Sequence, residues 1–157
     1  MTDTKKILDY LQQFPTLEAL LKMAEQDSEP ITEVNYAYKM STNASVYNKY
    51  NTICASISDF HRRLDYKQEY LASKLMRYYT GNPLDGEELL DKNLRAKTKT
   101  EAIKFIDLDV EYIKLKNQIK EIEILKATAY RILEFHKYEA NNINKFFDYV
   151  RYSNGAY

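Results

Sequence analysis

The sequence predicts an all-α protein built from long helices with coiled-coil-like packing. Only three Gly and three Pro occur in 157 residues, and so few chain-breaking residues favour long helices over a strand-and-turn fold. Two long stretches also place seam residues at alternating steps of four and three, which is the spacing of a helical packing seam. Charged residues make up 29% of the chain and are spread along both stretches, as solvated helix faces require.

The N-terminal residues 1–30 are expected to form a helical extension to a main domain of residues 31–155. Two apolar patches at helical spacing support this expectation: Ile7, Leu8, Leu11 and Phe14 form the first, and Leu17, Leu20, Leu21 and Ala24 the second. We favour a cap on the core over a partner-binding arm, because apolar patches this small are common on protein surfaces. Pro30, inside an acidic segment, marks the helix boundary.

A long helix is predicted from about residue 34 to residue 79. Its seam consists of Tyr36, Met40, Asn43, Tyr47, Tyr50, Cys54, Ile57, His61, Leu64, Gln68, Leu71, Leu75 and Tyr78. At 1.5 Å per residue such a helix would be roughly 70 Å long, so a second long helix or another subunit must cover it. Polar seam residues typically fix register. We therefore interpret His61 as a register residue rather than a ligand, and Cys54 as a small buried hydrophobe.

The segment 82–100 is predicted to be a polar connector. Gly81 stands where a left-handed helix cap belongs, with Pro83 after it. Four acids, Asp85, Glu87, Glu88 and Asp91, are followed by four bases, Lys92, Arg95, Lys97 and Lys99. A short helix over 87–94 is one reading of this pattern. The basic run is a second candidate for phosphate contact, and a solvated linker explains it equally well.

Residues 101–106 are expected to form a short apolar turn or strand-like contact, followed by C-terminal helices over about 107–152. Asp107 or Asp109 is the expected N-cap. The apolar frame of this part comprises Leu108, Leu115, Ile122, Leu125, Ala129, Ile132, His136, Ile143, Phe146 and Val150, interrupted by Glu111, Gln118 and Glu139. The pair Asn141-Asn142 allows a break into two helices.

The apolar face widens near the C-terminus, and a helix that is apolar over more than one stripe usually meets two neighbours. We therefore predict self-assembly through this region. The residues predicted to mediate it are Ile132, Phe135, Ile143, Phe146, Phe147 and Val150.

Composition limits where the protein works. The net charge is zero, so an electrostatic argument for a partner has to be local. A single cysteine excludes an intramolecular disulfide and fits a reducing compartment. No apolar run approaches the roughly 18 residues of a membrane span, and the N-terminus lacks the apolar region of a signal peptide. A cytoplasmic protein without membrane contact is expected.

The sequence contains no motif that predicts catalysis. Three scattered glycines cannot build a phosphate-binding loop, and two histidines and one cysteine lack metal-ligand spacing. No nucleophile and base stand at a spacing that would support a catalytic constellation. We predict a binding protein with no enzymatic activity, no metal and no cofactor.

A basic and aromatic stripe runs beside the seam of the long helix, up to Gly81. Lysine and arginine at helical spacing can follow a phosphate chain, and tyrosine rings can stack on bases. The predicted DNA-binding residues are Arg63, Lys67, Tyr70, Lys74, Arg77, Tyr78 and Tyr79. The alternative is a coiled-coil scaffold or adaptor with no nucleic-acid role, in which these charges are the solvated rim of the seam.

The chain resembles the UvsY family, the recombination mediator proteins of T-even-type phages. The resemblance covers about residues 34–155 in one order. It is carried by Tyr47-Asn48-Lys49-Tyr50, by the helix end Tyr78-Tyr79-Thr80-Gly81, by Ile106 to Lys116 and by Asn141 to Gly155.

The resemblance implies a small helical protein that forms a ring-like homo-oligomer, hexamer- or heptamer-like, through its C-terminal helix. It also implies binding of single-stranded DNA and loading of a RecA-like recombinase onto strands covered by single-stranded-DNA-binding protein, in phage homologous recombination and repair. An ungapped alignment of the Tyr-Tyr-small-Gly end puts the family's best-known basic pair on Ser73 and Leu75. The resemblance therefore assigns DNA binding to this region of the chain and not to individual residues. We favour the mediator over the scaffold.

Overall fold

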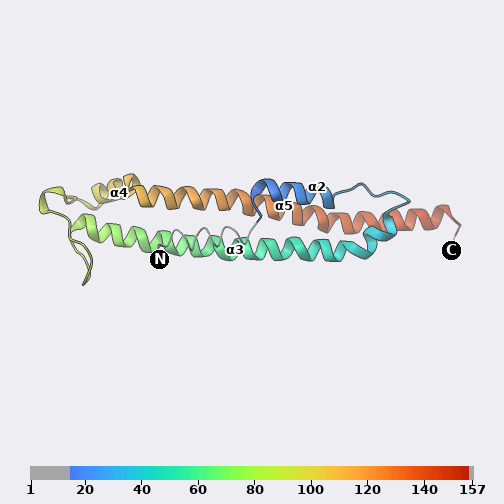
Figure 1. Ribbon diagram of the computed structural model, residues 1–157, viewed down its shortest axis with the longest axis horizontal. Helices are drawn as coiled ribbons and strands as arrows, with labels where there is room; N and C mark the ends of the chain where they lie inside the picture. The colour runs from blue at the N-terminus through green and yellow to red at the C-terminus, as the bar shows by residue number, and fades with distance from the viewer. Residues whose placement is uncertain (1–14, 156–157) are drawn as a thin grey trace. The chain divides into compact units, whose positions relative to one another are not determined.

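The computed structural model describes residues 15–155, and their secondary structure is helical (Figure 1). The elements are α2 (Leu17–Asp27), α3 (Tyr36–Thr80), the 3₁₀ turn η1 (Lys92–Leu94), α4 (Lys99–Leu108) and α5 (Val110–Ser153). Residues 15–155 contain no β-strand, so the predicted all-α class is confirmed. The first N-terminal apolar patch, Ile7 to Phe14, lies outside the described residues.

The chain divides into two compact units, to both of which α3 and α5 contribute. The terminal unit comprises Met1–Ser58 and Ile124–Tyr157, and the middle unit comprises Asp59–Glu123. Within each unit α3 and α5 pack antiparallel. In the terminal unit the ring of Tyr50 stacks on that of His136, with centroids 5.0 Å apart. In the middle unit Gln68 Nε2 donates to the Tyr112 hydroxyl over 3.3 Å.

The core of the terminal unit is formed by the predicted seam together with α2. The buried side chains include Leu20 of α2, Tyr50, Cys54 and Ile57 of α3, and Leu125, Ala129, His136 and Ile143 of α5. The free cysteine is buried among them, as expected. Thr16 is the N-cap of α2, and its hydroxyl accepts from the Ala19 N–H over 3.2 Å. The helix buries Leu20.

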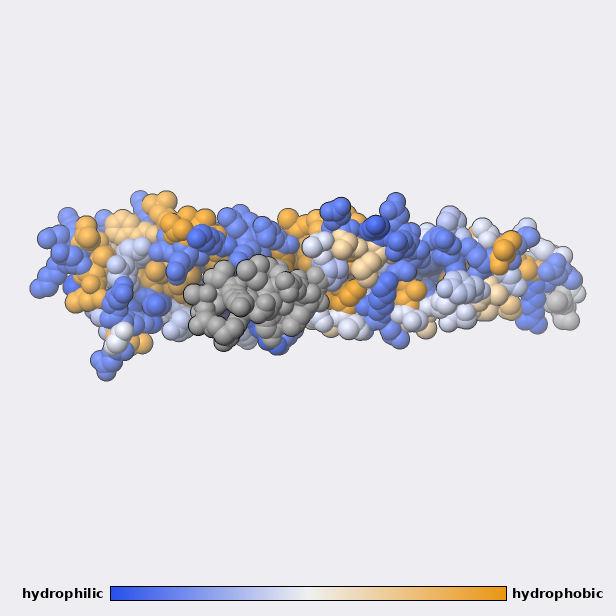
Figure 2. Space-filling model, viewed as in Figure 1, coloured by the Kyte–Doolittle hydropathy of each residue, from blue (hydrophilic) through white to orange (hydrophobic). Residues whose placement is uncertain are grey.

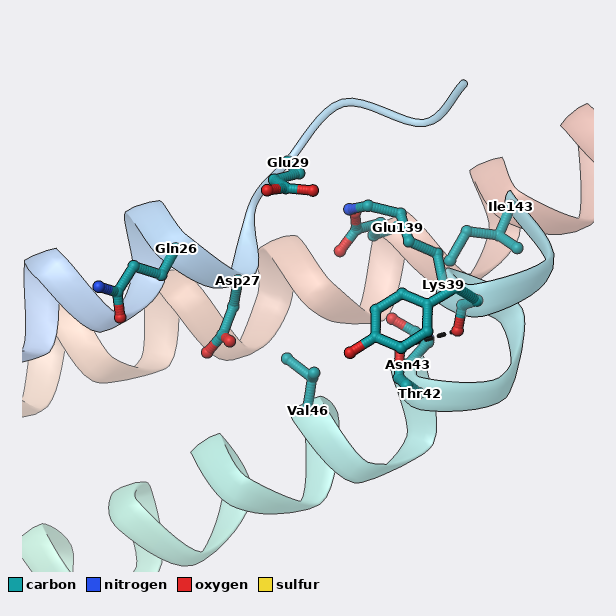
Figure 3. Close-up of a pocket in the computed structure, with 10 residues that line it drawn as sticks. Gln26, Asp27, Glu29, Lys39, Thr42, Asn43, Val46, Glu139 and Ile143 are labelled. Carbon is teal, nitrogen blue, oxygen red and sulfur yellow. Dashed lines mark hydrogen bonds and ion pairs between the residues drawn. The ribbon is translucent and has the colours of Figure 1, made fainter. Parts of the chain in front are cut away.

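One seam prediction is wrong at the start of α3. Met40 is 42% exposed, whereas Lys39 is 8% exposed and takes the inward position. The Lys39 ammonium lies 2.6 Å from Glu139 Oε1, and Glu139 Oε2 lies 2.9 Å from His136 Nδ1. Figure 3 shows Lys39 of α3 and Glu139 of α5 at this place. Because Glu139 interrupts the apolar frame of α5, the facing helix has to supply a cation.

In the middle unit, the turn or strand-like contact expected over 101–106 is wrong, because this segment belongs to α4. The Thr98 hydroxyl accepts from the Glu101 N–H over 3.2 Å. The Glu101 carboxylate accepts from the Lys97 N–H over 2.7 Å. This is close to a capping box, whose Thr-x-x-Glu signature is present in the sequence. The helix buries Ala102 and Ile106.

The start and course of α5 were predicted in part. Asp109 is its N-cap, as expected, since Oδ1 accepts from the N–H groups of Glu111 (2.9 Å) and Tyr112 (3.1 Å). Leu108, expected on the seam, ends α4 and is 74% exposed. The helix continues through Asn141 without a break. Of the short helix considered over 87–94, only η1 forms.

Apolar and charged side chains are interspersed on the face of the molecule that Figure 2 shows. Exposed large apolar residues occur on α2 (Leu17, Leu21) and on α4 (Ile103, Leu108). None of the helices in the described part of the chain is long and apolar enough to cross a membrane.

The Lys39–Glu139 ion pair provides a test of the core. We expect Lys39→Met to lower the free energy of unfolding by about 3–5 kcal/mol, because a carboxylate remains buried without its cation. The double variant Lys39→Met/Glu139→Gln should lose less unfolding free energy. No unpaired charge is then buried in the core, and the amide oxygen of Gln still accepts from His136. Urea unfolding at one fixed protein concentration measures both. Equal losses for the two variants would contradict the paired arrangement.

Candidate nucleic-acid interface

The C-terminal end of α3 fixes the end of the basic and aromatic stripe. Gly81 has φ +73°, the left-handed conformation expected of a helix cap. The N–H of Asn82 donates to the Arg77 carbonyl over 2.9 Å, and that of Gly81 to the Tyr78 carbonyl over 3.2 Å. These two bonds form a Schellman motif. The Ala96 N–H donates to the Tyr79 carbonyl over 2.9 Å, which ties the returning connector to the helix end.

Three of the predicted DNA-binding residues lie together around one cavity in the middle unit. Its volume is about 460 Å³, and its lining comprises Tyr70, Lys74, Leu75 and Tyr78 of α3 with Gly86, Glu87 and Glu88 of the connector. Tyr70 is 67% exposed, and Lys74 is also exposed. The cavity therefore combines aromatic rings and an ammonium group, which suit a nucleic-acid strand, with two carboxylates, which do not.

The first two residues of the stripe, Arg63 and Lys67, are exposed on α3 and do not line this cavity. Arg63 Nη2 lies 2.7 Å from Asp59 Oδ2, and Arg62 Nη2 lies 2.5 Å from the other oxygen of that carboxylate. Hydrogen bonds from Arg62 and then Arg63 lower the pKa of Asp59. Arg63 therefore has a partly neutralised charge, whereas Lys67 has no ion-pair partner among residues 15–155.

Arg77 is held by the connector in what we call the Arg77–Glu87 clamp. Arg77 Nε donates to Glu87 Oε2 over 2.9 Å, and Nη2 donates to Oε1 over 2.5 Å. The Leu84 N–H donates to Oε2 over 2.9 Å, and Arg77 Nη1 donates to the Ser73 hydroxyl over 2.9 Å. The hydrogen bond from Arg77, followed by that from Leu84, lowers the pKa of Glu87 to about 2.

The residue pattern did not predict this clamp. Four acids between 85 and 91 indicated a carboxylate near the helix end. Spacing alone did not show which of them would reach Arg77, because the path of the connector depends on the tie between Ala96 and Tyr79.

The two tyrosines at the end of the stripe have different surroundings. Tyr78 lines the cavity, whereas Tyr79 packs on Phe105 of α4, with ring centroids 5.5 Å apart. The Tyr79 hydroxyl donates to Asp109 Oδ2 over 3.3 Å. Burial, and then the charge of Asp109, raises the pKa of Tyr79. Tyr79 therefore connects α3 to α4 and α5, and Tyr78 is the better placed of the two for stacking.

The second basic run contains three exposed lysines, Lys92, Lys97 and Lys99. Arg95 differs from them because its Nε donates to the Leu90 carbonyl over 2.9 Å. Its side chain also covers Gly81, where an added Cβ would meet Arg95 Cδ at 2.5 Å. Arg95 therefore stabilises the connector.

The residues predicted to mediate assembly lie in the terminal unit, in unlike environments. Ile143 is 1% exposed and packs in the core of its own chain. Phe146 and Phe147 lie beside Tyr36, with ring centroids 5.9 and 6.3 Å apart, and Val150 is half-buried. Phe135 is 49% exposed. A groove of about 360 Å³ between α2 and α5 is lined by Leu21, Ala24, Ser28, Thr128, Arg131, Ile132 and Phe135.

A smaller cavity of about 220 Å³ in the terminal unit lies beside Asp27, Lys39 and Glu139 (Figure 3). These three charged groups bind one another or neighbouring side chains. Asp27 Oδ2 accepts from the Tyr50 hydroxyl over 2.7 Å and from Lys49 over 2.8 Å. Burial acts to raise the pKa of Asp27, but these two hydrogen bonds outweigh it and lower the pKa. The described residues contain no group of three or more His, Cys, Asp or Glu side chains that could hold a metal ion.

Comparison with known structures identifies the fold. Two crystal structures of the bacteriophage T4 recombination mediator protein UvsY, lattice types II and IV, match 87% of this chain at 20% identity and a TM-score of 0.72. The match covers 96% and 98% of those chains. The lattice type I structure matches 85% of this chain at 19% identity and a TM-score of 0.70. No family model and no curated protein matches the chain. The resemblance read from the sequence is thus confirmed at the level of the fold.

The Arg77–Glu87 clamp predicts an unusual titration. The folded-state pKa of Glu87 is about 2, below the ordinary value of 4.5 for a glutamate. The clamp therefore stabilises the fold above about pH 4, and this contribution is lost as the pH falls through about 2. Carbon-detected NMR of the Glu87 carboxyl should give a midpoint near 2, and Arg77→Gln should move it toward 4.5. A wild-type midpoint near 4.5 would show that the clamp is open in solution.

Proposed function

We propose that this chain is a recombination mediator. It binds single-stranded DNA and loads a RecA-like recombinase onto strands covered by single-stranded-DNA-binding protein. It acts in phage homologous recombination and repair, in the cytoplasm of the host cell, as a binding protein and not as an enzyme.

One observation carries this proposal. The chain spans 96–98% of the length of two solved chains named as recombination mediator proteins, at a TM-score of 0.72. The structural match covers 87% of this chain and supports the mediator proposal at the level of the whole fold.

Binding rests on local charge and on stacking, because the net charge of the chain is zero. Lys67 and Lys74 neutralise phosphates and release counterions, and Tyr70 and Tyr78 stack on bases at about 1–3 kcal/mol per base. A single subunit offers a small site. A ring-like homo-oligomer repeats that site along one strand and raises the affinity through effective concentration.

A scaffold or adaptor with no nucleic-acid role is the second candidate. It is favoured by the ion pairs of Arg63 with Asp59 and of Arg77 with Glu87, since paired rim charges are common along helical seams. Lys67 and Lys74, the two exposed lysines of the stripe, distinguish the candidates. A mediator needs them to bind phosphates, whereas a scaffold does not.

We expect Lys67→Glu/Lys74→Glu to weaken binding of a labelled single-stranded oligonucleotide by at least tenfold at low salt. Each lost phosphate contact should also reduce the slope of log affinity against log salt by about 0.7. Fluorescence anisotropy across a salt series measures both quantities. The matched control is Lys104→Glu/Lys120→Glu, which makes the same charge change at exposed positions on α4 and α5 of the same unit.

Equal weakening by the two double variants would show that general charge, and not this stripe, governs binding. Absence of wild-type binding at low salt would favour the scaffold.

Assembly is proposed to use the exposed part of the apolar surface on α5. Phe135, together with Ile132, lines the groove against α2, and half of Phe135 remains exposed in the single chain. Burial of such an aromatic side chain by a second copy stabilises an assembly.

We expect Phe135→Asp to shift the protein toward smaller species in sedimentation velocity, because a carboxylate in the contact has to be desolvated. Asn141→Asp is the control, since it adds the same charge at an exposed position on another face of α5. Circular dichroism checks that both variants keep their helix content. Unchanged sedimentation of Phe135→Asp would place the assembly contact elsewhere.

A further inference from the structure

Among the cavities, buried charges and exposed surfaces of the described residues, the Arg77–Glu87 clamp supports an inference that builds on the proposed function. We propose that Glu87 occupies the place of a DNA phosphate on Arg77, so that a bound single strand displaces the connector carboxylate and takes over the guanidinium.

The hydrogen-bond geometry of Arg77 supports this exchange. The Nε and Nη2 groups both point at one carboxylate. This pair of donors is the edge of a guanidinium that binds a phosphate in the same two-point manner. The remaining side, Nη1, donates to Ser73 one turn back on α3. Three of the five guanidinium N–H groups are therefore engaged. A phosphate can bind the Nε/Nη2 edge of Arg77 only after Glu87 has left.

The placement of the connector supports the same conclusion. Glu87 and Glu88 line the cavity that Tyr70, Lys74 and Tyr78 also line. The charge of Lys74 contributes, after Arg77 and Leu84, to the lowered pKa of Glu87. A strand that stacks on the two tyrosines and meets Lys74 therefore comes up against the carboxylates of the connector, which repel its phosphates.

The clamp is exposed enough to open. The side chains of Arg77 and Glu87 are 24% and 17% exposed, so water reaches both groups. In addition, the Glu87 side chain is held by the Leu84 N–H within its own turn, and this bond does not depend on Arg77. The turn can therefore keep its internal bond while Arg77 changes partner.

The test compares two variants that remove the same charge from the connector. Glu87→Gln removes the carboxylate that holds Arg77, and Glu88→Gln removes its exposed neighbour on the same cavity. In anisotropy titrations with a labelled oligothymidine of about 20 nucleotides, we expect Glu87→Gln to tighten binding by about threefold more than Glu88→Gln, as release of a partly exposed ion pair implies. In an Arg77→Gln background this extra factor should vanish.

A second readout uses the wild-type protein and does not depend on how any variant folds. Exchange frees the Glu87 carboxyl, so its NMR titration midpoint should rise from about 2 toward 4.5 when the oligothymidine is bound. The Asp27 carboxyl, which accepts from Lys49 and Tyr50 in the terminal unit and contacts none of the predicted DNA-binding residues, serves as the internal comparison.

The outcomes separate the two proposals. If the wild type binds the oligothymidine but Glu87→Gln and Glu88→Gln behave alike, the exchange is overturned and the proposed function stands. If Glu87→Gln binds more weakly than the wild type, Glu87 orients Arg77 and does not compete for it, which also overturns the exchange. If neither the wild type nor any variant binds at low salt, both the proposed function and the exchange of Glu87 for a phosphate are overturned.

Discussion

The antiparallel contact between α3 and α5 determines where the other elements of each unit lie. A helix as long as α3 presents an apolar seam that no short element can cover, and α5 supplies the matching surface in both units. Polar residues in the seam of one helix need a partner on the other helix. Lys39 forms an ion pair with Glu139, and Gln68 donates a hydrogen bond to Tyr112. Such matched polar pairs set register more than they add stability.

The same contact explains why the candidate interface lies at the end of α3. The residues of the stripe precede those of the seam by one position in the sequence. Because the seam faces α5, the stripe lies at the surface, and Lys67 and Lys74 are exposed. The connector then has to return from the end of α3 to the start of α4. On this path it passes the stripe and brings Glu87 and Glu88 beside Lys74. The candidate interface therefore includes acids of the connector in addition to the residues of the stripe.

Periodicity predicted the fold well, and the pairing of side chains poorly. The long helix and its cap at Gly81 followed from steps of four and three and from one glycine. By contrast, α4 was missed because six apolar-rich residues give too little periodicity, although Thr98 and Glu101 carried a capping signal. The burial of Lys39 and the clamp on Arg77 depend on residues 100 and 10 positions away. No local pattern in a single sequence selects partners at such distances.

The tie between Ala96 and Tyr79 has a consequence for how this chain can vary. It closes the base of a loop. At the tip of this loop Gly86 has open space beside it, because an added Cβ would meet nothing within 4 Å, although the next residue, Glu87, is held by Arg77. Lengthening a closed loop is inexpensive, at about 0.6 kcal/mol for each doubling. Insertions and deletions among related chains should therefore accumulate at this tip, while the residues that close the base keep their spacing. The loop is a place where evolution can add length without disturbing the helices.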